Sequence, residues 1–462
     1  MGIRPIARGR AFVDRWRGIL PLLAAEAIIW IGFGALLPIL PVYFRDHGVD
    51  LAMLGLVVAA WPAARLLAEP VFGWIADHTR RVPLMLIGLV ATAIAISLSV
   101  VFVGPVEFLV LRAVAGLASA IYDPAARGYL VDATPPERRG EAFGLYGAAQ
   151  MSGLLVGPAI GGLGAAALGG LGFVFVFCAV ATLVAAIAIA VFVHESGAPR
   201  ATGAGPAIPS VGRAGLPTDE SILAGEPIAA IVRDAAPPPP TVSTPATRPP
   251  ARLWNRLLLS AIALQVGSFY AGGTYEVVWT LFLQSRGAGL DFVGLTFAMF
   301  GLPVLLLSPV AGRWVDRRGS LGFLIVGSIL PAVCGVAYTV APETWMVIPL
   351  ILTEASGFAI LSPALFAVVA AGSPVGRSST AQGLFGAAGT IGTIVASATT
   401  GYLAAIDLRL PFWVFSVVML GSLVIALAIG WRAIAALGPG GSSERRTSPG
   451  ESELEPPLRA TD

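Results

Sequence analysis

The sequence predicts an all-α membrane protein with twelve transmembrane helices, arranged as two six-helix bundles related by an internal repeat. Three observations support this prediction. Of the 462 residues, 56% are hydrophobic and only 12% are charged, which is roughly half the charged fraction of a soluble protein. The apolar residues fall in runs of about 20, the length that crosses a bilayer. Several short stretches also recur at one fixed spacing.

The repeat is clearest in a charged stretch, where Gly73 and Asp77 return as Gly312 and Asp316, each 239 positions later. The same offset relates three further pairs of stretches, which are Gly55-Leu56 and Gly294-Leu295, Pro124-Ala125 and Pro363-Ala364, and Gly144-Leu145 and Gly383-Leu384. One offset shared by separate stretches indicates two structural halves of about six helices each.

The apolar runs give the expected helices. They cover residues 18–44, 53–76, 83–104, 107–131, 141–166 and 171–193 in the first half, and 256–285, 291–312, 320–341, 344–371, 379–405 and 411–433 in the second. The predicted domains are an N-terminal segment 1–17, a bundle 18–193, a linker 194–255, a bundle 256–433 and a tail 434–462. Four consecutive prolines at 237–240 and the polar composition predict that linker and tail are mostly disordered.

Arginine placement predicts the orientation, because every basic residue of the chain is Arg. Arginines are frequent before the first helix, after the second and fourth helices, in the linker and after the eighth helix, whereas the opposite loops carry only Arg45, Arg286 and Arg409. By the positive-inside rule, both termini and the linker are cytoplasmic. We therefore expect a multi-pass protein of the plasma (cytoplasmic) membrane.

The charged stretch and its copy resemble the loops between helices 2 and 3, and between helices 8 and 9, of major facilitator superfamily (MFS) transporters. The resemblance implies a conformational latch at the cytoplasmic face, in which Arg81 pairs with Asp132 at the end of the fourth helix. The latch residues are expected to be Gly73, Asp77, Arg81, Asp132, Gly312, Asp316 and Arg317. Two residues, His78 and Arg80, depart from the family pattern. The alternative is a solvated charge cluster that only fixes topology.

The expected fifth helix carries Gly153, Gly157, Pro158, Gly161 and Gly162. Glycines at this spacing let a partner helix approach closely, and a proline bends the helix. The stretch resembles the antiporter signature of the drug:proton antiporter branch of the family, which implies export rather than import. Generic packing of small residues is the alternative.

Charged residues inside the predicted membrane spans are candidates for proton coupling. In the first half these are Glu26, Asp123 and Arg112. Together with Glu69, Arg65 and Arg127 they are expected to be able to form a mutually ion-paired network. Glu26 resembles the proton and substrate site in helix 1 of some multidrug antiporters. The alternative is that Glu26 is only the structural partner of an arginine.

The second half differs, because its helix interiors hold Glu276 and Glu354 and no basic residue. A carboxylate without a cationic partner in a low dielectric favours its protonated form, which suits a proton carrier or a cation site. For Glu276, a polar residue at a wet helix end is an equally weighted alternative. The repeat counterpart of Glu26 is Gln265, so the titratable chemistry is asymmetric.

These features predict a secondary active transporter, with proton-coupled efflux of small hydrophobic or cationic compounds by alternating access. The substrate is expected between the halves, against the aromatic residues Trp30, Phe33, Tyr270, Tyr275 and Trp279. A proton-coupled importer of a small metabolite on the same fold is the main alternative, and a membrane sensor that transports nothing is another.

Other function classes find little support in the sequence. The two cysteines, Cys178 and Cys334, lie inside apolar runs and are read as core residues. There is no His/Cys cluster or Ser/His pair in the expected helices, which argues against an enzyme or a metal site. The expected partners are a small-molecule substrate, protons and the lipid bilayer, without nucleic acid or cofactor, and the protein is expected to act as a monomer.

Overall fold

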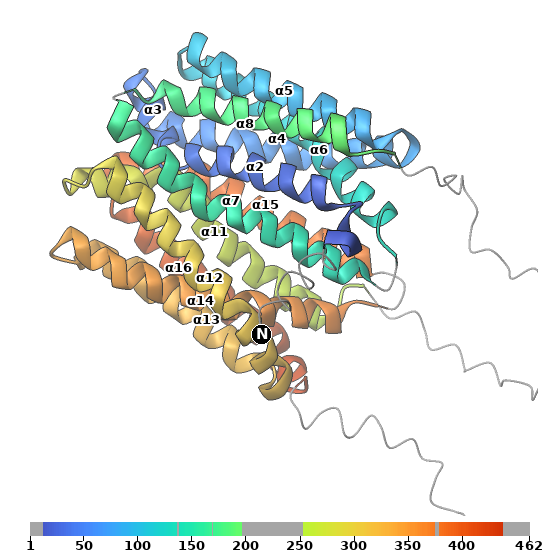
Figure 1. Ribbon diagram of the computed structural model, residues 1–462. Helices are drawn as coiled ribbons and strands as arrows, with labels where there is room; N and C mark the ends of the chain where they lie inside the picture. Colours follow the sequence, from blue (N-terminus) through green and yellow to red (C-terminus); the bar gives the residue numbers. More distant parts are fainter. Residues whose placement is uncertain (1–12, 136–137, 169, 196–252, 375–377, 438–462) are drawn as a thin grey trace, which may run out of the picture. The chain divides into compact units, whose positions relative to one another are not determined.

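In the computed structural model, the described residues are 13–135, 138–168, 170–195, 253–374 and 378–437. Most of the predicted linker and tail, together with residues 1–12, lies outside them. Within the described part of the chain, long helices alternate with short connections and there is no strand. Figure 1 shows these helices, coloured from blue and green in the first half to yellow and red in the second.

The helices of the first half are α2 (Leu20–Leu36), α3 (Leu40–Asp46), α4 (Leu51–His78), α5 (Arg81–Val101), α6 (Pro105–Asp132), α7 (Arg139–Leu168) and α8 (Gly172–Phe192). Those of the second half are α11 (Arg256–Ser285), α12 (Leu290–Arg318), α13 (Leu321–Val340), the 3-10 turn η2 (Thr344–Met346), α14 (Val347–Gly372), α15 (Ser378–Ile406) and α16 (Leu410–Ala435). The predicted all-helical membrane fold is confirmed.

Among the described helices, ten are long and apolar enough to cross a membrane, or eleven if the bent pair α2 and α3 is one span. The expected fifth span corresponds to the glycine-rich helix α7. It has 30 residues but is not among the helices apolar enough to be counted as membrane spans. It packs against α2 in its own half and against α12 in the other half, so its position is that of a spanning helix.

The first expected helix is broken in the structure. The axes of α2 and α3 differ by 47°. Pro38 and Pro41 follow the end of α2, and each proline removes a backbone N–H and clashes with the preceding turn. The break is thus encoded in the sequence, although the apolar run continues through it.

The two halves use the same packing plan. In the first half, α2 packs on α7 and α8, α4 on α6, and α5 on α6 and α8. In the second half, α11 packs on α15 and α16, α12 on α14, and α13 on α14 and α16. The halves contact each other through α4 with α15 and through α7 with α12.

A pair of equivalent turns marks one end of the helices. Gly48 follows α3 with φ of 86°, and Gly287 follows α11 with φ of 82°, again 239 positions apart. Positive φ at both places explains the glycines, because a side chain there would be strained. We call this end the Gly48 end, and the opposite end, which carries Asp77, Asp132 and Asp316, the Asp77 end.

Candidate functional site

The carboxyl group of Glu26 is buried in the first half and held by three hydrogen-bond donors. Its side chain is 1% exposed. Oε1 accepts from Trp30 Nε1 at 3.0 Å and from Gln150 Nε2 at 2.6 Å, and Oε2 accepts from the Tyr122 hydroxyl at 2.6 Å. The donors come from α2, α7 and α6, so the carboxyl ties three helices together. Because each donor favours a charged acceptor, this arrangement stabilises a carboxylate without an ion pair.

The equivalent place in the second half carries no ionisable group. The repeat relates Glu26 to Gln265, Trp30 to Phe269 and Gln150 to Gly389. These three residues meet in the structure as their counterparts do, because a methyl group added at Gly389 would lie 3.1 Å from both the Gln265 amide and the Phe269 ring. The Glu26 site is therefore a property of the first half alone.

Four charged side chains from α4 and α6 form a neutral cluster. Arg65 lies 2.6 Å from Asp123 and 3.1 Å from Glu69. Arg127 lies 3.6 Å from Glu69 and 4.0 Å from Asp123. The ion-paired network expected from the sequence thus contains these four residues, whereas Glu26 has its own hydrogen-bonded site. Asp123 is neutralised by Arg65, which makes it a weaker candidate for proton exchange than Glu26.

Arg112 is not part of that cluster. Its Nη2 lies 2.9 Å from Oε1 of Glu276 on α11, in the other half. Both side chains are mostly buried, at 9% and 18% exposed. Glu276 therefore has a cationic partner. The sequence predicted none, because the helix interiors of the second half contain no basic residue. The sequence could not reveal the partner, because the two residues are 164 positions apart.

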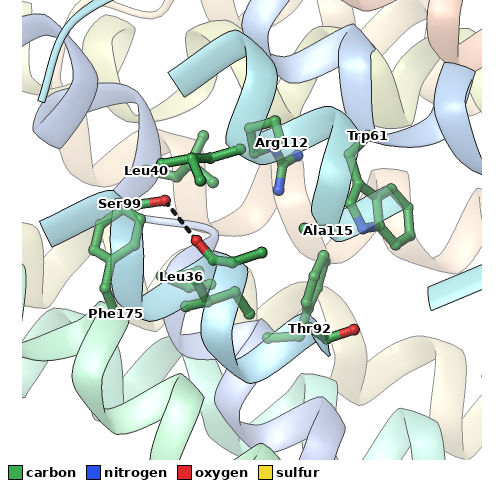
Figure 2. A pocket seen from close by; sticks show the side chains of 12 residues that line it. Leu36, Leu40, Trp61, Thr92, Ser99, Arg112, Ala115 and Phe175 are labelled. Atoms are coloured by element: carbon green, nitrogen blue, oxygen red, sulfur yellow. Dashed lines mark hydrogen bonds between the residues drawn. The ribbon is translucent and has the colours of Figure 1, made fainter. Parts of the chain in front are cut away.

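Figure 2 shows a small pocket next to Arg112, within the first half, with Trp61 and Phe175 in its wall. Its volume is about 20 Å³, which is room for about one water molecule. The Arg112 Nε and Trp61 Nε1 atoms are buried and have no hydrogen-bond partner in the described part of the chain. Leaving such atoms without a hydrogen bond destabilises the fold, and a water molecule in the pocket would reduce this destabilisation by bonding to them.

The repeat explains why this space is open in one half and filled in the other. Leu36, Ser99 and Ala115 line the pocket, and their counterparts at an offset of 239 are Tyr275, Tyr338 and Glu354. In the second half these three larger residues meet in the core. The Tyr338 hydroxyl donates to Glu354 Oε2 at 2.6 Å, and the Tyr275 hydroxyl donates to Glu354 Oε1.

Glu354 is therefore a second buried carboxyl held by hydrogen-bond donors, at 1% exposed. Both donors are tyrosines, from α11 and α13. No ion pair to Glu354 occurs among the residues that the structure describes. It stays a candidate for proton coupling, beside Glu26.

The aromatic residues predicted to line a substrate cavity divide into two groups. Trp30 and Phe33 are partly exposed on α2 and contact each other edge to face. Tyr270 and Trp279 are buried in the core of the second half, at 5% and 3% exposed, and Tyr275 is bonded to Glu354. These three are thus core residues in this conformation.

The exposed aromatic on α11 is Phe269, which is 45% exposed and was missed from the sequence. The repeat could have found it, because Phe269 is the counterpart of Trp30. One turn further along, Gly272 leaves open space around its Cα. The helix face that runs from Phe269 past Gly272 to Glu276 is therefore the better candidate for substrate contact in the second half.

The predicted latch residues of the first half meet at the Asp77 end. Arg81 Nε donates to Asp132 Oδ2 at 2.6 Å, and Arg81 Nη1 lies 3.6 Å from Asp77. Asp77 is 70% exposed and belongs to the last turn of α4 rather than to a loop. All three residues are in one half, so the pairing joins α4, α5 and α6 and does not reach the other half.

The second copy of the charged stretch has a different turn. Asp316 and Arg317 are exposed in the last turn of α12, and Gly319 ends the helix with φ of 83°. Its counterpart Arg80 has an extended backbone, with φ of −70°. This explains why Arg80 is tolerated where the family pattern has glycine. Both copies share one packing contact. Gly73 faces Pro124 and Gly312 faces Pro363, and in each case a methyl group added at the glycine would lie 3.9 Å from the proline.

The glycines of α7 face two different helices. A methyl group added at Gly153 would lie 2.6 Å from the Ala27 carbonyl, at Gly157 it would lie 2.8 Å from Gly34 Cα, and at Gly161 it would lie 2.9 Å from Ala35 Cα. These three glycines bring the backbone of α7 against α2. Gly162 instead faces α12, with Gly294 Cα at 3.0 Å from the added methyl group. The predicted close approach is present, and it extends to the other half.

The halves meet closely at the Gly48 end. Besides Gly162 with Gly294, Gly55 of α4 lies against Gly401 of α15, at 3.0 Å from an added methyl group to Gly401 Cα. Toward the Asp77 end of α7 and α15, the glycines Gly144, Gly147, Gly383 and Gly386 have nothing within 4 Å of an added methyl group. The described contacts between the halves are therefore tight at the Gly48 end and absent at these glycines.

Comparison with known proteins agrees with this architecture. The sequence profile of the Major Facilitator Superfamily matches residues 22–283 and 257–457. The chain is 30% identical over 135 residues to the quinolone resistance protein NorA of Staphylococcus aureus, which covers 29% of this chain and 35% of NorA. It is 26% identical over 175 residues to multidrug resistance protein 2 of Bacillus subtilis, which covers 38% and 43%. The matched segments thus span less than half the length of these relatives.

Solved structures share the fold over most of the chain. The nucleoside transporter NupG is matched with a TM-score of 0.68 and 12% identity, over 89% of this chain and 99% of NupG. A bacterial homologue of the human lysosomal transporter Spinster, in an inward-facing and unoccupied conformation, is matched with a TM-score of 0.66 and 16% identity, over 94% and 99%. At such low identity the likeness concerns the fold alone.

Proposed function

The chain belongs to the Major Facilitator Superfamily, and we propose that this membrane transporter exports small hydrophobic or cationic compounds in exchange for protons. Two observations support the direction. The relatives matched in sequence are named for resistance to quinolones and to multiple drugs, and the glycines of α7 form the close helix contacts that the antiporter-type motif predicts.

The observation that carries proton coupling is the Glu26 site. Three donors stabilise the carboxylate form, whereas burial away from water opposes it. Because these two effects oppose each other, a rearrangement of the donors would change the balance between the two protonation states. The second half has Gln265 at the equivalent place, so the repeat itself does not require a carboxyl there.

Substrate and proton are proposed to use separate places. Glu26 is 1% exposed and its oxygens are occupied by donors, so a cationic substrate could not reach it without displacing them. The proposed substrate contacts are the exposed parts of the side chains of Trp30, Phe33, Phe269 and Glu276. This differs from what the resemblance of Glu26 to the helix 1 site of some multidrug antiporters implies, which is one site for both proton and substrate.

The helix α7 is the proposed link between the two places. Its Gln150 bonds Glu26, its Gly153, Gly157 and Gly161 lie against α2, and its Gly162 lies against α12 of the other half. A change in the Glu26 hydrogen bonds therefore acts on a helix that contacts both halves. Interfaces packed this closely are bistable rather than continuously deformable, which favours a rocking motion between two states.

The conformation described here is proposed to be the one that admits substrate from the cytoplasm. The halves are tightly joined at the Gly48 end. The arginine distribution places the Asp77 end at the cytoplasmic face, so a cavity between the halves would open there. In the opposite conformation the contacts at the Gly48 end would separate and release the compound outside.

Purified protein in proteoliposomes tests this function. With a fluorescent lipophilic cation as the probe, an imposed pH gradient should drive the probe across the membrane in the direction opposite to the proton flow. In a separate measurement, adding the probe to purified protein in a weakly buffered solution should release protons. Probe movement in the same direction as protons would instead support the importer alternative. Absence of any response to the pH gradient, with downhill transport intact, would contradict proton coupling.

A further inference from the structure

We propose that the junction of α11 and α16 at the Asp77 end binds the phosphate headgroup of an anionic phospholipid. Arg256 and Arg432 hold the phosphate, and Trp254 and Trp431 flank the headgroup at the edge of the bilayer. This site lies outside the proposed proton and substrate sites, so its existence depends neither on export nor on proton coupling.

The first turn of α11 lies directly against the last turns of α16. A methyl group added at Gly430 would lie 3.0 Å from the carbonyl oxygen of Arg256, and the Ser260 hydroxyl donates to the carbonyl oxygen of Ala426 at 2.9 Å. Arg256 is the first residue of α11, and Arg432 follows Gly430 by two positions. The two arginines therefore start from backbone segments in contact, so both guanidinium groups can reach one bound phosphate.

The end of α16 presents its arginine at the surface. Gly430 interrupts the helical geometry, with φ of −142° and ψ of 15°. In the turn that follows, Ile434 is 1% exposed and packs in the core of the second half, whereas Trp431 and Arg432 are exposed. The turn is thus anchored in the core on one side and offers a tryptophan and an arginine on the other.

Two exposed tryptophans accompany the arginines. Trp254 directly precedes the cap of α11 and is 58% exposed, and Trp431 is 52% exposed. The central guanidinium carbon of Arg432 lies 5.8 Å from the centre of the Trp431 ring. Tryptophan is enriched at the level of lipid headgroups, because its ring is apolar and its N–H is polar. These side chains indicate that the junction lies in the headgroup region of the bilayer.

The charge of the two arginines is not neutralised by the protein. Among the residues that the structure describes, no acidic side chain forms an ion pair with Arg256 or Arg432. Arginine binds phosphate oxygens through two parallel N–H bonds. Anionic lipids of the cytoplasmic leaflet are attracted to such basic places between membrane helices. An anionic headgroup is therefore the occupant that matches the junction in charge and in depth.

The repeat shows that the first half lacks this arrangement. The counterparts of Arg256 and Arg432 at an offset of 239 are Arg17 and Val193. Arg17 lies 3.2 Å from Asp14, and Val193 is 3% exposed. The equivalent place thus holds a single arginine that is already paired, which makes Arg17→Gln a matched control for Arg256→Gln.

A second control separates a site from general attraction to a basic surface. Arg317 lies in the last turn of α12 at the same end, is exposed and has no ion pair in the described part of the chain. Diffuse attraction of anionic lipid would make Arg317 as important as Arg256, whereas a site at the junction would not.

The test is native mass spectrometry of the purified full-length protein titrated with phosphatidylglycerol, with phosphatidylcholine of the same acyl chains as the neutral comparison. The wild type should bind one phosphatidylglycerol more tightly than any further lipid. Arg256→Gln and Arg432→Gln should each weaken this binding about fivefold, which is the contribution of one arginine to the attraction of anionic lipid. Arg17→Gln and Arg317→Gln should leave it unchanged, and Arg256→Lys, which keeps the charge, should lose less than Arg256→Gln.

Three outcomes would overturn the inference. Equal weakening by Arg317→Gln and Arg256→Gln would show diffuse attraction to the whole face. Phosphatidylcholine bound as tightly as phosphatidylglycerol would exclude recognition of the anionic headgroup. Protection against thermal unfolding by inorganic phosphate as strong as that by phosphatidylglycerol would assign the arginines to a free anion. All the substituted side chains are exposed, so the melting temperatures in lipid-free detergent should equal that of the wild type.

Discussion

Arg112 of α6 and Glu276 of α11 form an ion pair across the two halves, with Nη2 and Oε1 2.9 Å apart. Among the described residues, the other ion pairs each lie within the first half. The counterparts at an offset of 239 are Ile351 for Arg112 and Leu37 for Glu276, so the repeat does not generate a second such pair. The pair stabilises the conformation that is closed at the Gly48 end.

The variant Glu276→Gln should shift the protein toward opening at the Gly48 end. Removing one partner of a mostly buried ion pair costs roughly 3–5 kcal/mol in the state that contains it. Spin labels at Asp46 and Ile406, both exposed at the Gly48 end, should show a larger population of long distances. Arg112→Glu combined with Glu276→Arg should restore the short distance.

The matched control for this shift is Glu343→Gln, which removes an exposed acid near the same end. It should leave the distance distribution unchanged. If Glu276→Gln also leaves it unchanged while the protein remains folded, the ion pair does not hold the halves together.

The variant Gly161→Ala should destabilise the fold by about 1–3 kcal/mol, as overpacking does. The added methyl group would lie 2.9 Å from Ala35 Cα, and the carbonyl of Ala35 is also in its way. Gly147→Ala on the same helix is the control, because an added methyl group there meets nothing within 4 Å. Thermal unfolding in detergent should show a lower melting temperature for Gly161→Ala only. Equal melting temperatures would show that α2 and α7 tolerate a wider separation.

The variant Arg81→Gln should slow transport without weakening substrate binding. It removes the 2.6 Å bond to Asp132 and the contact with Asp77, which join helix ends remote from the proposed substrate surface. Because Asp132 is 42% exposed, the loss of stability should be at most about 1 kcal/mol. Turnover in proteoliposomes and probe binding in detergent measure the two effects, with Arg80→Gln as the control. Loss of binding in a folded Arg81→Gln protein would place the pair in the substrate site.

Much of the fold could be predicted from the sequence, because membrane helices must satisfy their backbone internally and so appear as long apolar runs. The 239-residue offset indicated the two halves, and the structure adds equivalent turns at Gly48 and Gly287 with the same offset. The break between α2 and α3 was missed, since the apolar run continues through Pro38. The charges of the Asp77 stretch were also expected in a loop, whereas Asp77 and His78 belong to the last turn of α4.

The candidate site was predictable only where its members share a helix or a repeat. Glu26 and Trp30 lie four residues apart, which puts them on one face of a helix, and they are bonded. The remaining donors, Tyr122 and Gln150, come from helices whose packing is not readable from spacing. The partner of Glu276 and the burial of Trp279 were not predictable from the sequence either, because both depend on how the helices pack.

Proton coupling at Glu26 is tested by measuring pH-gradient-driven export of the lipophilic cation by Glu26→Gln in proteoliposomes, compared with the wild type and with Glu354→Gln. Glu354 is also buried and held by two donors, so it matches Glu26 in environment. We predict that Glu26→Gln exchanges the probe downhill but no longer accumulates it in response to the pH gradient. Accumulation equal to that of the wild type would remove Glu26 from the mechanism, and selective loss in Glu354→Gln would move the coupling site to the second half.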